Sequence, residues 1–162
     1  MKKTIIGVCG KPCCGKTYLL ERLAPKSSDD FMIVNCDKLA KEISALYKQD
    51  IEKMLGTSDS KIVANIIFSD KKKYKKFTKF IWNLLKLFLE QIVANSKCST
   101  IILDAPLLLE SGMEEMCDTV IRFDTKYEVR LERALGRGWN KEELDRRDSF
   151  FKKGTSAIFR NN

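Results

Sequence analysis

Short apolar runs rich in β-branched residues recur along the chain, bounded by glycine or polar positions. Four strong runs lie at 4–9, 32–36, 99–103 and 119–123, and a weaker fifth run lies at 156–160. Runs that are apolar on both sides are typical of strands buried in a parallel sheet. Apolar positions have helical spacing at 17–23, 43–54, 62–68, 72–94, 129–135 and 141–151. This alternation predicts an α/β fold, a three-layer sandwich with a five-stranded, mainly parallel sheet.

Two longer segments between the predicted strands are expected to add helices to this sheet. No convincing strand signal occurs between the second and third apolar runs, which predicts a helical insertion over about 38–97. A smaller excursion over about 126–152 contains Gly136-Arg137-Gly138, and glycines on both sides of an arginine predict a hinge in a mobile lid. With 162 residues, of which 44% are hydrophobic, the chain is expected to be a single domain over 1–162.

The apolar runs and the net charge of the sequence both limit the kinds of partner that we expect. No run of about 18 uncharged apolar residues exists, and the apolar run after Met1-Lys2-Lys3 is too short for an export signal, so we expect a cytoplasmic protein without a membrane partner. A formal charge of +8 favours polyanionic partners. Because no base-reading motif is present, phosphorylated small molecules are favoured over nucleic acid. The lysine cluster at 71–79 is either a solvated helix face or a phosphate-attracting patch. A monomer or weak homo-oligomer is expected.

The segment Gly10-Lys11-Pro12-Cys13-Cys14-Gly15-Lys16-Thr17 matches GxxxxGK[ST] between an apolar run and a helical segment. In that context the pattern predicts a phosphate-binding loop of the P-loop kinase type, in which backbone N–H groups surround a phosphate at a helix N-terminus. Lys16 is expected to reach the β- and γ-phosphates, and the Thr17 hydroxyl is expected to ligate Mg²⁺. Tyr18, the next residue, is included in the predicted ATP site.

Two adjacent cysteines in this loop raise the alternative of a metal or redox site. The chain has six cysteines, no CxxC pair and no histidine, which disfavours a zinc site, and without an export signal a disulfide framework is not expected. The thiols of Cys13 and Cys14 are therefore interpreted as bystanders. The helix N-terminus and Lys16 could nevertheless lower a thiol pKa there and make either cysteine oxidisable.

Aspartates follow two of the predicted strands. Asp37 comes after the second apolar run, where it could accept a proton from an attacking hydroxyl or cap the helix that begins at Lys38. Asp104 ends the third run, where it could hold Mg²⁺ directly or through water, or serve as a capping residue.

The lid stretch supplies arginines that either form a solvated face or neutralise charge on a triphosphate. Its arginines are Arg130, Arg133, Arg137, Arg146 and Arg147. Two or three of them are expected to point inward.

Several segments, in the right order, resemble the dephospho-coenzyme A kinase family. They are the loop at 10–17, Val34-Asn35-Cys36-Asp37-Lys38-Leu39-Ala40-Lys41, Asp104-Ala105-Pro106-Leu107-Leu108-Leu109-Glu110, the stretch at 133–147, and the terminal Ile158-Phe159-Arg160-Asn161-Asn162. The resemblance implies transfer of the γ-phosphoryl group of ATP to the ribose 3′-hydroxyl of dephospho-coenzyme A, with Mg²⁺.

The resemblance also implies roles for individual residues. Asp37 matches the family's catalytic carboxylate, and Lys16 and Arg137 join it as catalytic residues. Lys41 stands where the family has arginine. The implied acceptor-binding residues are Asp37, Lys41, Asp104, Leu107 and Glu110. The implied ATP-binding residues outside the loop are Arg133, Arg137, Arg147 and Asn161, with Asn162 also near the adenine site.

The sequence departs from the family mainly on the acceptor side, at Ala64, at Trp82-Asn83 and at Phe151. Another small-metabolite kinase of the same architecture, acting on a nucleoside or nucleotide, is therefore an alternative. A second alternative is an ATP-binding module without transfer activity. A GTPase is disfavoured because Asn140-Lys141-Glu142-Glu143 lacks the final aspartate of its base-recognition motif, and no DxxG follows the third run.

Overall fold

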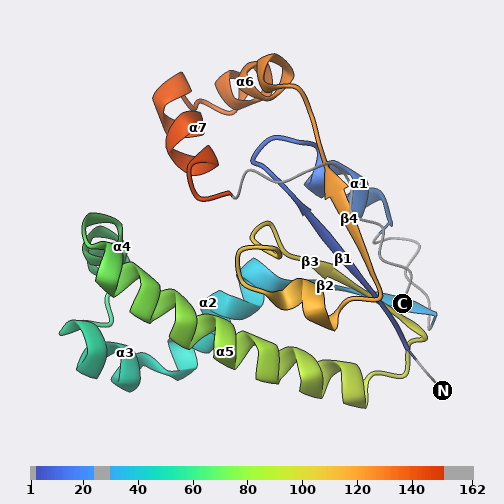
Figure 1. Cartoon of the computed structure of the whole chain (residues 1–162), viewed down its shortest axis with the longest axis horizontal. Helices are drawn as coiled ribbons and strands as arrows, with labels where there is room; N and C mark the ends of the chain where they lie inside the picture. The colour runs from blue at the N-terminus through green and yellow to red at the C-terminus, as the bar shows by residue number, and fades with distance from the viewer. Residues whose placement is uncertain (1–2, 24–29, 152–162) are drawn as a thin grey trace. The chain divides into compact units, whose positions relative to one another are not determined.

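The computed structural model describes residues 3–23 and 30–151 of the chain. These residues form four strands, seven α-helices and a 3-10 helix (Figure 1). The chain divides into two compact units. We call residues 1–35 with 96–162 the sheet unit, and residues 36–95 the helical unit. The α/β fold predicted from the alternation of apolar runs is confirmed.

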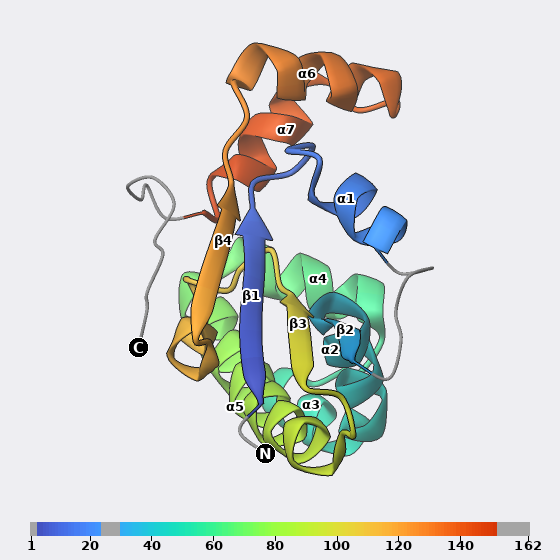
Figure 2. The same ribbon diagram turned by 90° about the vertical axis from the view of Figure 1, so that its right-hand side faces the viewer.

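All strands of the described sheet are parallel. They are β1 (Thr4–Gly10), β2 (Phe31–Asn35), β3 (Thr100–Asp104) and β4 (Thr119–Phe123), in the order β2-β3-β1-β4 (Figure 2). Their register pairs Val8 with Asp104, Asn35 with Asp104, and Gly10 with Phe123. The carboxyl ends of the strands therefore meet at one edge. The fifth strand expected at 156–160 lies outside the described residues.

Aliphatic side chains of β1, β3 and β4 contribute to the core of the sheet unit. Val8, Ile101, Leu103 and Val120 are all buried. Burial of such side chains is the main favourable term in folding. The apolar runs carried this signal, and they place each strand within about one residue of its observed bounds.

Gly7 of β1 is a point of close approach between the sheet and the segment that follows β3. A Cβ at this position would lie 2.5 Å from Leu108 Cδ2 and 2.8 Å from Cys117 Sγ. Leu108 is fully buried and has little room to move. We expect Gly7→Ala to lower the free energy of unfolding by about 1–3 kcal/mol through overpacking, measured by urea denaturation.

The matched control is Gly136→Ala, because no atom lies within 4 Å of a Cβ built there. This control is expected to be neutral or slightly stabilising, since alanine restricts the unfolded chain. Equal unfolding free energies for the two variants would contradict the close approach at Gly7.

The helical unit contains α2 (Cys36–Leu46), α3 (Lys48–Leu55), α4 (Ser60–Ser69) and α5 (Lys71–Asn95). Its core is made by Ile51, Val63, Ile67 and Ile81. Asp59 caps α4 by accepting from the N–H groups of Lys61 and Ile62, both at 3.0 Å. The helices predicted at 62–68 and 72–94 are confirmed, each with small extensions.

The helical prediction at 43–54 is confirmed except at one residue. Within this range α2 ends at Leu46 and α3 begins at Lys48, with Tyr47 between them. Tyr47 leaves helical geometry with ψ 31°, and its ring packs edge-on against Phe80 at 6.1 Å between centroids. The apolar spacing continues on both sides of the break, so periodicity alone carries no sign of it.

The sheet unit also holds α1 (Lys16–Leu23), the 3-10 helix η2 (Met113–Met116), α6 (Tyr127–Gly136) and α7 (Lys141–Asp148). The helices predicted at 17–23 and 129–135 are confirmed, whereas the one predicted at 141–151 ends at Asp148 and continues as turns. Asn140 caps α7, since its side chain accepts from the Glu143 N–H at 2.8 Å. Within the described part of the chain, no helix is long and apolar enough to cross a membrane.

Candidate active site

The loop at 10–17 leaves the carboxyl end of β1 and opens α1, as its sequence context predicts. Gly10 has φ 155°, and a Cβ there would lie 2.8 Å from the Phe123 carbonyl oxygen, so only glycine fits beside β4. Gly15 has φ 98° and Cys13 has φ 62°, conformations that turn the loop sharply before the helix. The Cys14 N–H donates to the Lys11 carbonyl at 3.3 Å.

Three successive carbonyls of the loop are held from outside by side chains on the β4–α6 side. The Pro12 carbonyl accepts from Arg130 Nη1 at 3.2 Å, and the Cys13 carbonyl accepts from Arg133 Nη1 at 3.0 Å. The Cys14 carbonyl accepts from the Thr125 hydroxyl at 2.9 Å. In a trans peptide the C=O and the following N–H point in opposite directions. These contacts therefore direct the N–H groups of Cys13 and Gly15 away from α6.

The cysteines of the loop are buried rather than presented to a ligand. Cys13 is 6% exposed and forms a small hydrophobic cluster with Ala134 of α6 and Leu144 of α7. Cys14 is also 6% exposed. Its side chain lies against Gly10, where a Cβ would be 2.8 Å from Cys14 Sγ. Cys13 thus anchors the loop on the α6–α7 pair, and burial limits the access that oxidation of either thiol requires.

The other buried thiols of the sheet unit are held in the protonated form. Desolvation by burial raises the pKa of Cys9 to about 11 and that of Cys117 to about 12. A protonated thiol is a poor nucleophile and a poor metal ligand. Among residues 3–23 and 30–151, no cluster of three or more metal-ligating side chains of the His, Cys, Asp and Glu types occurs. The raised pKa values of Cys9 and Cys117 therefore argue against thiolate chemistry at these two residues.

A buried ion pair lies at the carboxyl edge of the sheet. Lys16 Nζ donates to the Asp104 carboxylate, and the two residues are each 7% exposed. Asn35 at the end of β2 also donates its side-chain amide to Asp104, at 3.3 Å. The pair holds the ammonium of Lys16 next to the start of α1, and a helix N-terminus favours anions.

Thr17 and Asp104 are the side chains predicted to hold Mg²⁺. Thr17 is exposed in the first turn of α1, and Asp104 is at the carboxyl end of β3. Hydroxyl and carboxylate oxygens suit Mg²⁺, which is commonly bound by one or two protein groups together with substrate phosphates and water. The small number of protein ligands at this edge therefore fits a magnesium ion that arrives with a nucleotide.

The three arginines of the lid segment that are predicted to bind ATP differ in their surroundings. Arg133 contacts the loop through the Cys13 carbonyl. Arg137 is exposed at the C-terminal end of α6. Arg147 donates to Glu143 at 2.7 Å and stacks on the Trp139 ring at 4.2 Å. The contact of Arg133 is thus with the loop itself. The ATP-binding roles of all three arginines stay predictions, as does movement about 136–138.

Asp37 and Lys41 lie on α2 in the helical unit, and both are exposed. The alternative in which Asp37 caps a helix starting at Lys38 is wrong, because α2 begins at Cys36 and contains Asp37 in its first turn. A carboxylate in the first turn still interacts favourably with the helix dipole. The strand predicted at 32–36 ends at Asn35, because Cys36 is already the first residue of α2.

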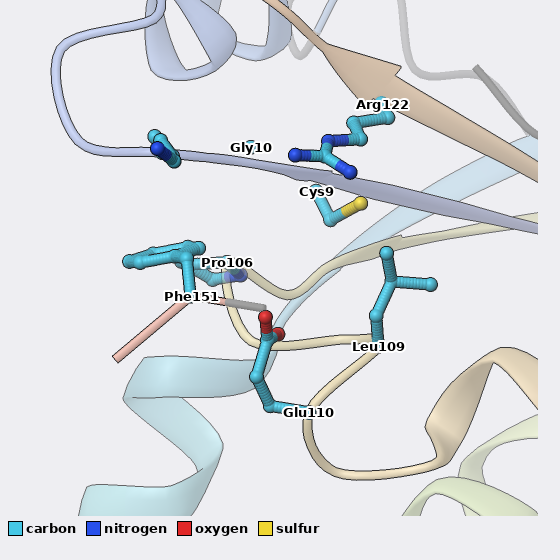
Figure 3. A pocket seen from close by; sticks show the side chains of 8 residues that line it. Cys9, Gly10, Pro106, Leu109, Glu110, Arg122 and Phe151 are labelled. Carbon is cyan, nitrogen blue, oxygen red and sulfur yellow. The ribbon is translucent and has the colours of Figure 1, made fainter. Parts of the chain in front are cut away.

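A pocket opens between the end of β1 and the turn that follows β3 (Figure 3). It is lined by Cys9, Gly10, Lys11, Pro106, Leu109, Glu110, Arg122 and Phe151. In Figure 3 the carboxylate of Glu110 and the guanidinium of Arg122 both point into this space. Glu110 was predicted as an acceptor-binding residue, whereas Leu107, predicted with it, is not among the lining residues. Asn161 and Asn162 lie outside the described residues.

Sequence reasoning missed residues that support the loop from behind. Thr125 and Asp148 were not considered, and Arg130 was considered but not selected. Thr125 follows β4 by two residues and so lies at the carboxyl edge, which is a signal that was available. Arg130 precedes Arg133 by three positions and shares its helix face. No sequence pattern singles out Asp148 among the acidic residues of α7.

Comparisons with known proteins show which family the chain resembles. Residues 4–149 match the family model described as dephospho-CoA kinase. A dephospho-CoA kinase of Fusobacterium nucleatum is 30% identical, covering 89% of this chain and 78% of its own. A dephospho-CoA kinase of Aquifex aeolicus is 29% identical, covering 88% of this chain and 77% of its own.

Solved structures show the same fold. A crystal structure of a Thermus thermophilus protein superimposes with a TM-score of 0.84 at 21% identity, covering 94% of this chain and 82% of that one. A dephospho-CoA kinase from Campylobacter jejuni gives a TM-score of 0.60 at 22% identity, covering 91% and 79%. The family model spans both the phosphate-binding loop and α7, and with it this chain belongs to the dephospho-CoA kinase family.

Proposed function

We propose that this chain transfers the γ-phosphoryl group of ATP to the ribose 3′-hydroxyl of dephospho-coenzyme A, giving coenzyme A, the last step of its biosynthesis. The observation that carries the proposal is the buried Lys16–Asp104 pair at the mouth of a phosphate-binding loop, in a chain that matches the family model over 4–149. The activity follows from the family, and the loop supplies its physical basis.

ATP is expected to bind with its phosphates in the loop at 10–17. The N–H groups of Cys13 and Gly15 point away from the side chains that hold the Pro12 and Cys14 carbonyls, and phosphate oxygens would accept from them. Lys16 would exchange its contact with Asp104 for the β- and γ-phosphates, since a triphosphate carries more negative charge than one carboxylate. Arg133, Arg137 and Arg147 would stabilise the charge that develops during transfer.

The acceptor side rests on Asp37. Its carboxylate would accept the proton of the ribose 3′-hydroxyl as that oxygen bonds to the γ-phosphorus and the bond from phosphorus to the ADP oxygen breaks. Lys41, Leu107 and Glu110 are proposed to contact the acceptor. The segment at 38–97 is proposed as a substrate-binding insertion and the segment at 126–152 as a lid.

Mg²⁺ would be held by the Thr17 hydroxyl and the Asp104 carboxylate. When bound, this ion neutralises charge on the β- and γ-phosphates. The residues at hand fit this role, because both offer hard oxygen ligands at the carboxyl edge of the sheet. Asp104 would be freed for it when Lys16 turns to the nucleotide.

A coupled assay of ADP release tests the proposal. With Mg²⁺ and ATP, dephospho-coenzyme A is expected to stimulate ADP release at least about tenfold over buffer, and chelation of Mg²⁺ is expected to abolish the stimulation. A panel of nucleosides and nucleotides serves as the comparison, because the resemblance to the family assigns the departures at Ala64 and Trp82-Asn83 to the acceptor side. Stimulation by a nucleoside and none by dephospho-coenzyme A would overturn the proposal in favour of another small-metabolite kinase.

A further inference from the structure

Arg130 of α6 is a buried cation next to the phosphate-binding loop. Its exposed fraction is 3%. Its Nε donates to the Thr125 carbonyl at 3.2 Å, and its Nη1 donates to the Pro12 carbonyl at 3.2 Å. Thr125 in turn donates its hydroxyl to the Cys14 carbonyl at 2.9 Å. One guanidinium thus supports two carbonyls of the loop, Pro12 directly and Cys14 through Thr125.

Asp148, the last residue of α7, fixes this guanidinium. Its two carboxylate oxygens accept from Arg130 Nη1 at 2.8 Å and from Nη2 at 2.6 Å. The hydrogen bonds that Arg130 donates to Asp148 raise the pKa of Arg130 above its ordinary value. Lys11 of the loop also approaches Asp148, at 3.7 Å between Nζ and Oδ2. The carboxylate therefore joins α6, α7 and the loop.

We propose that Arg130, held in place by Asp148, is a positioning residue that orients the loop's peptide groups toward the β-phosphate of the nucleotide. The peptide between Pro12 and Cys13 has its carbonyl tied to Arg130, which directs the Cys13 N–H to the opposite side. The peptide between Cys14 and Gly15 is oriented in the same way through Thr125. This inference rests on the proposed function, because it presumes that the loop binds a nucleotide.

The alternative is that the Arg130–Asp148 pair only holds α6 to α7. A second contact between the same helices separates the two possibilities. Asp145 of α7 accepts from the Tyr127 hydroxyl of α6 at 2.6 Å and from Lys141 at 3.1 Å, and neither partner belongs to the loop. Asp145→Asn and Asp148→Asn are therefore matched variants: each removes one carboxylate between α6 and α7, and only the second removes support from the loop.

The experiment measures dissociation constants for ADP and AMP, since ADP has a β-phosphate and AMP has none. For Asp148→Asn in the full chain, we expect ADP to bind about tenfold more weakly and AMP to change by less than about twofold, because a charge-assisted hydrogen bond that holds the loop is weakened. For Asp145→Asn, both constants are expected to stay within about twofold of the unmodified chain.

Equal weakening of ADP and AMP by Asp148→Asn, or unchanged ADP binding, would overturn the proposal. If Asp148→Asn fails to fold, Arg130→Lys decides: it keeps the charge but loses the planar fork, so the same selective loss of ADP is expected. The titrations need no acceptor. A chain that binds ADP but does not phosphorylate dephospho-coenzyme A would therefore contradict the proposed function and leave this test intact.

Discussion

Lys16→Met is expected to reduce kcat/KM for ATP by about a hundredfold to a thousandfold, the range found when one preorganised charge-stabilising donor is removed. Lys16 is buried at the start of α1 and bonded to Asp104, so its ammonium is already in the binding site before phosphate arrives. Methionine keeps most of the side-chain length and the apolar contacts but removes the charge. ADP release with dephospho-coenzyme A as acceptor measures the effect.

The control for this prediction is Lys126→Met, since Lys126 is an exposed lysine of the sheet unit that precedes α6. Its activity is expected to stay within about twofold of the unmodified chain. Lys16→Met also leaves the buried Asp104 without its cation, which costs stability. Activity is therefore compared per folded molecule, after a urea titration of each variant. Retention of more than about a tenth of kcat/KM would contradict the role given to Lys16.

The strands and the phosphate-binding loop could be predicted from sequence because their signals are local. A parallel strand is apolar on both sides, and the loop has fixed glycine, lysine and hydroxyl positions between a strand and a helix. Asp104 followed from the same reasoning, as a carboxylate at a strand end. These predictions depend on neighbours in the chain, and the structure leaves them within about one residue of where they were placed.

Features that depend on distant contacts could not be predicted. The break at Tyr47 accompanies the packing of its ring on Phe80 in α5. The burial of Cys13 against Ala134 and Leu144 joins segments more than a hundred residues apart. In both cases the local pattern is compatible with another outcome: a continuous helix in the first, and an exposed thiol at a helix N-terminus in the second.

The contacts of Arg130 with the loop also depend on a residue distant in the sequence. Arginines at helical spacing are usually solvated, so no local pattern favours Arg130 over Arg137 or Arg147. The structure shows Arg130 buried, whereas Arg137 and Arg147 are exposed. The deciding partner, Asp148, lies 18 residues further along the chain. The position of the loop was predictable from its motif, but the contacts that reach it from α6 and the end of α7 were not.

Asp37→Asn is expected to cut turnover of dephospho-coenzyme A by about a hundredfold or more while the dissociation constant for ATP stays unchanged. The amide cannot accept the proton of the ribose hydroxyl, and loss of a positioned acid–base group typically costs about a hundredfold to ten-thousandfold. ATP affinity should be kept, because the phosphate-binding groups belong to the loop and Asp37 belongs to α2. Single-turnover kinetics with saturating ATP isolate the transfer step.

Asp50→Asn separates catalysis from a helix-dipole effect. Asp50 is an exposed carboxylate in the first turn of α3, as Asp37 is in the first turn of α2. Both substitutions remove a favourable charge near a helix N-terminus, at a cost of about 0.3–1 kcal/mol. Asp37→Asn is expected to lower turnover as well as stability, whereas Asp50→Asn is expected to lower stability alone. If the two variants lose similar stability and both keep their turnover, Asp37 acts through the helix and the proton acceptor is another group.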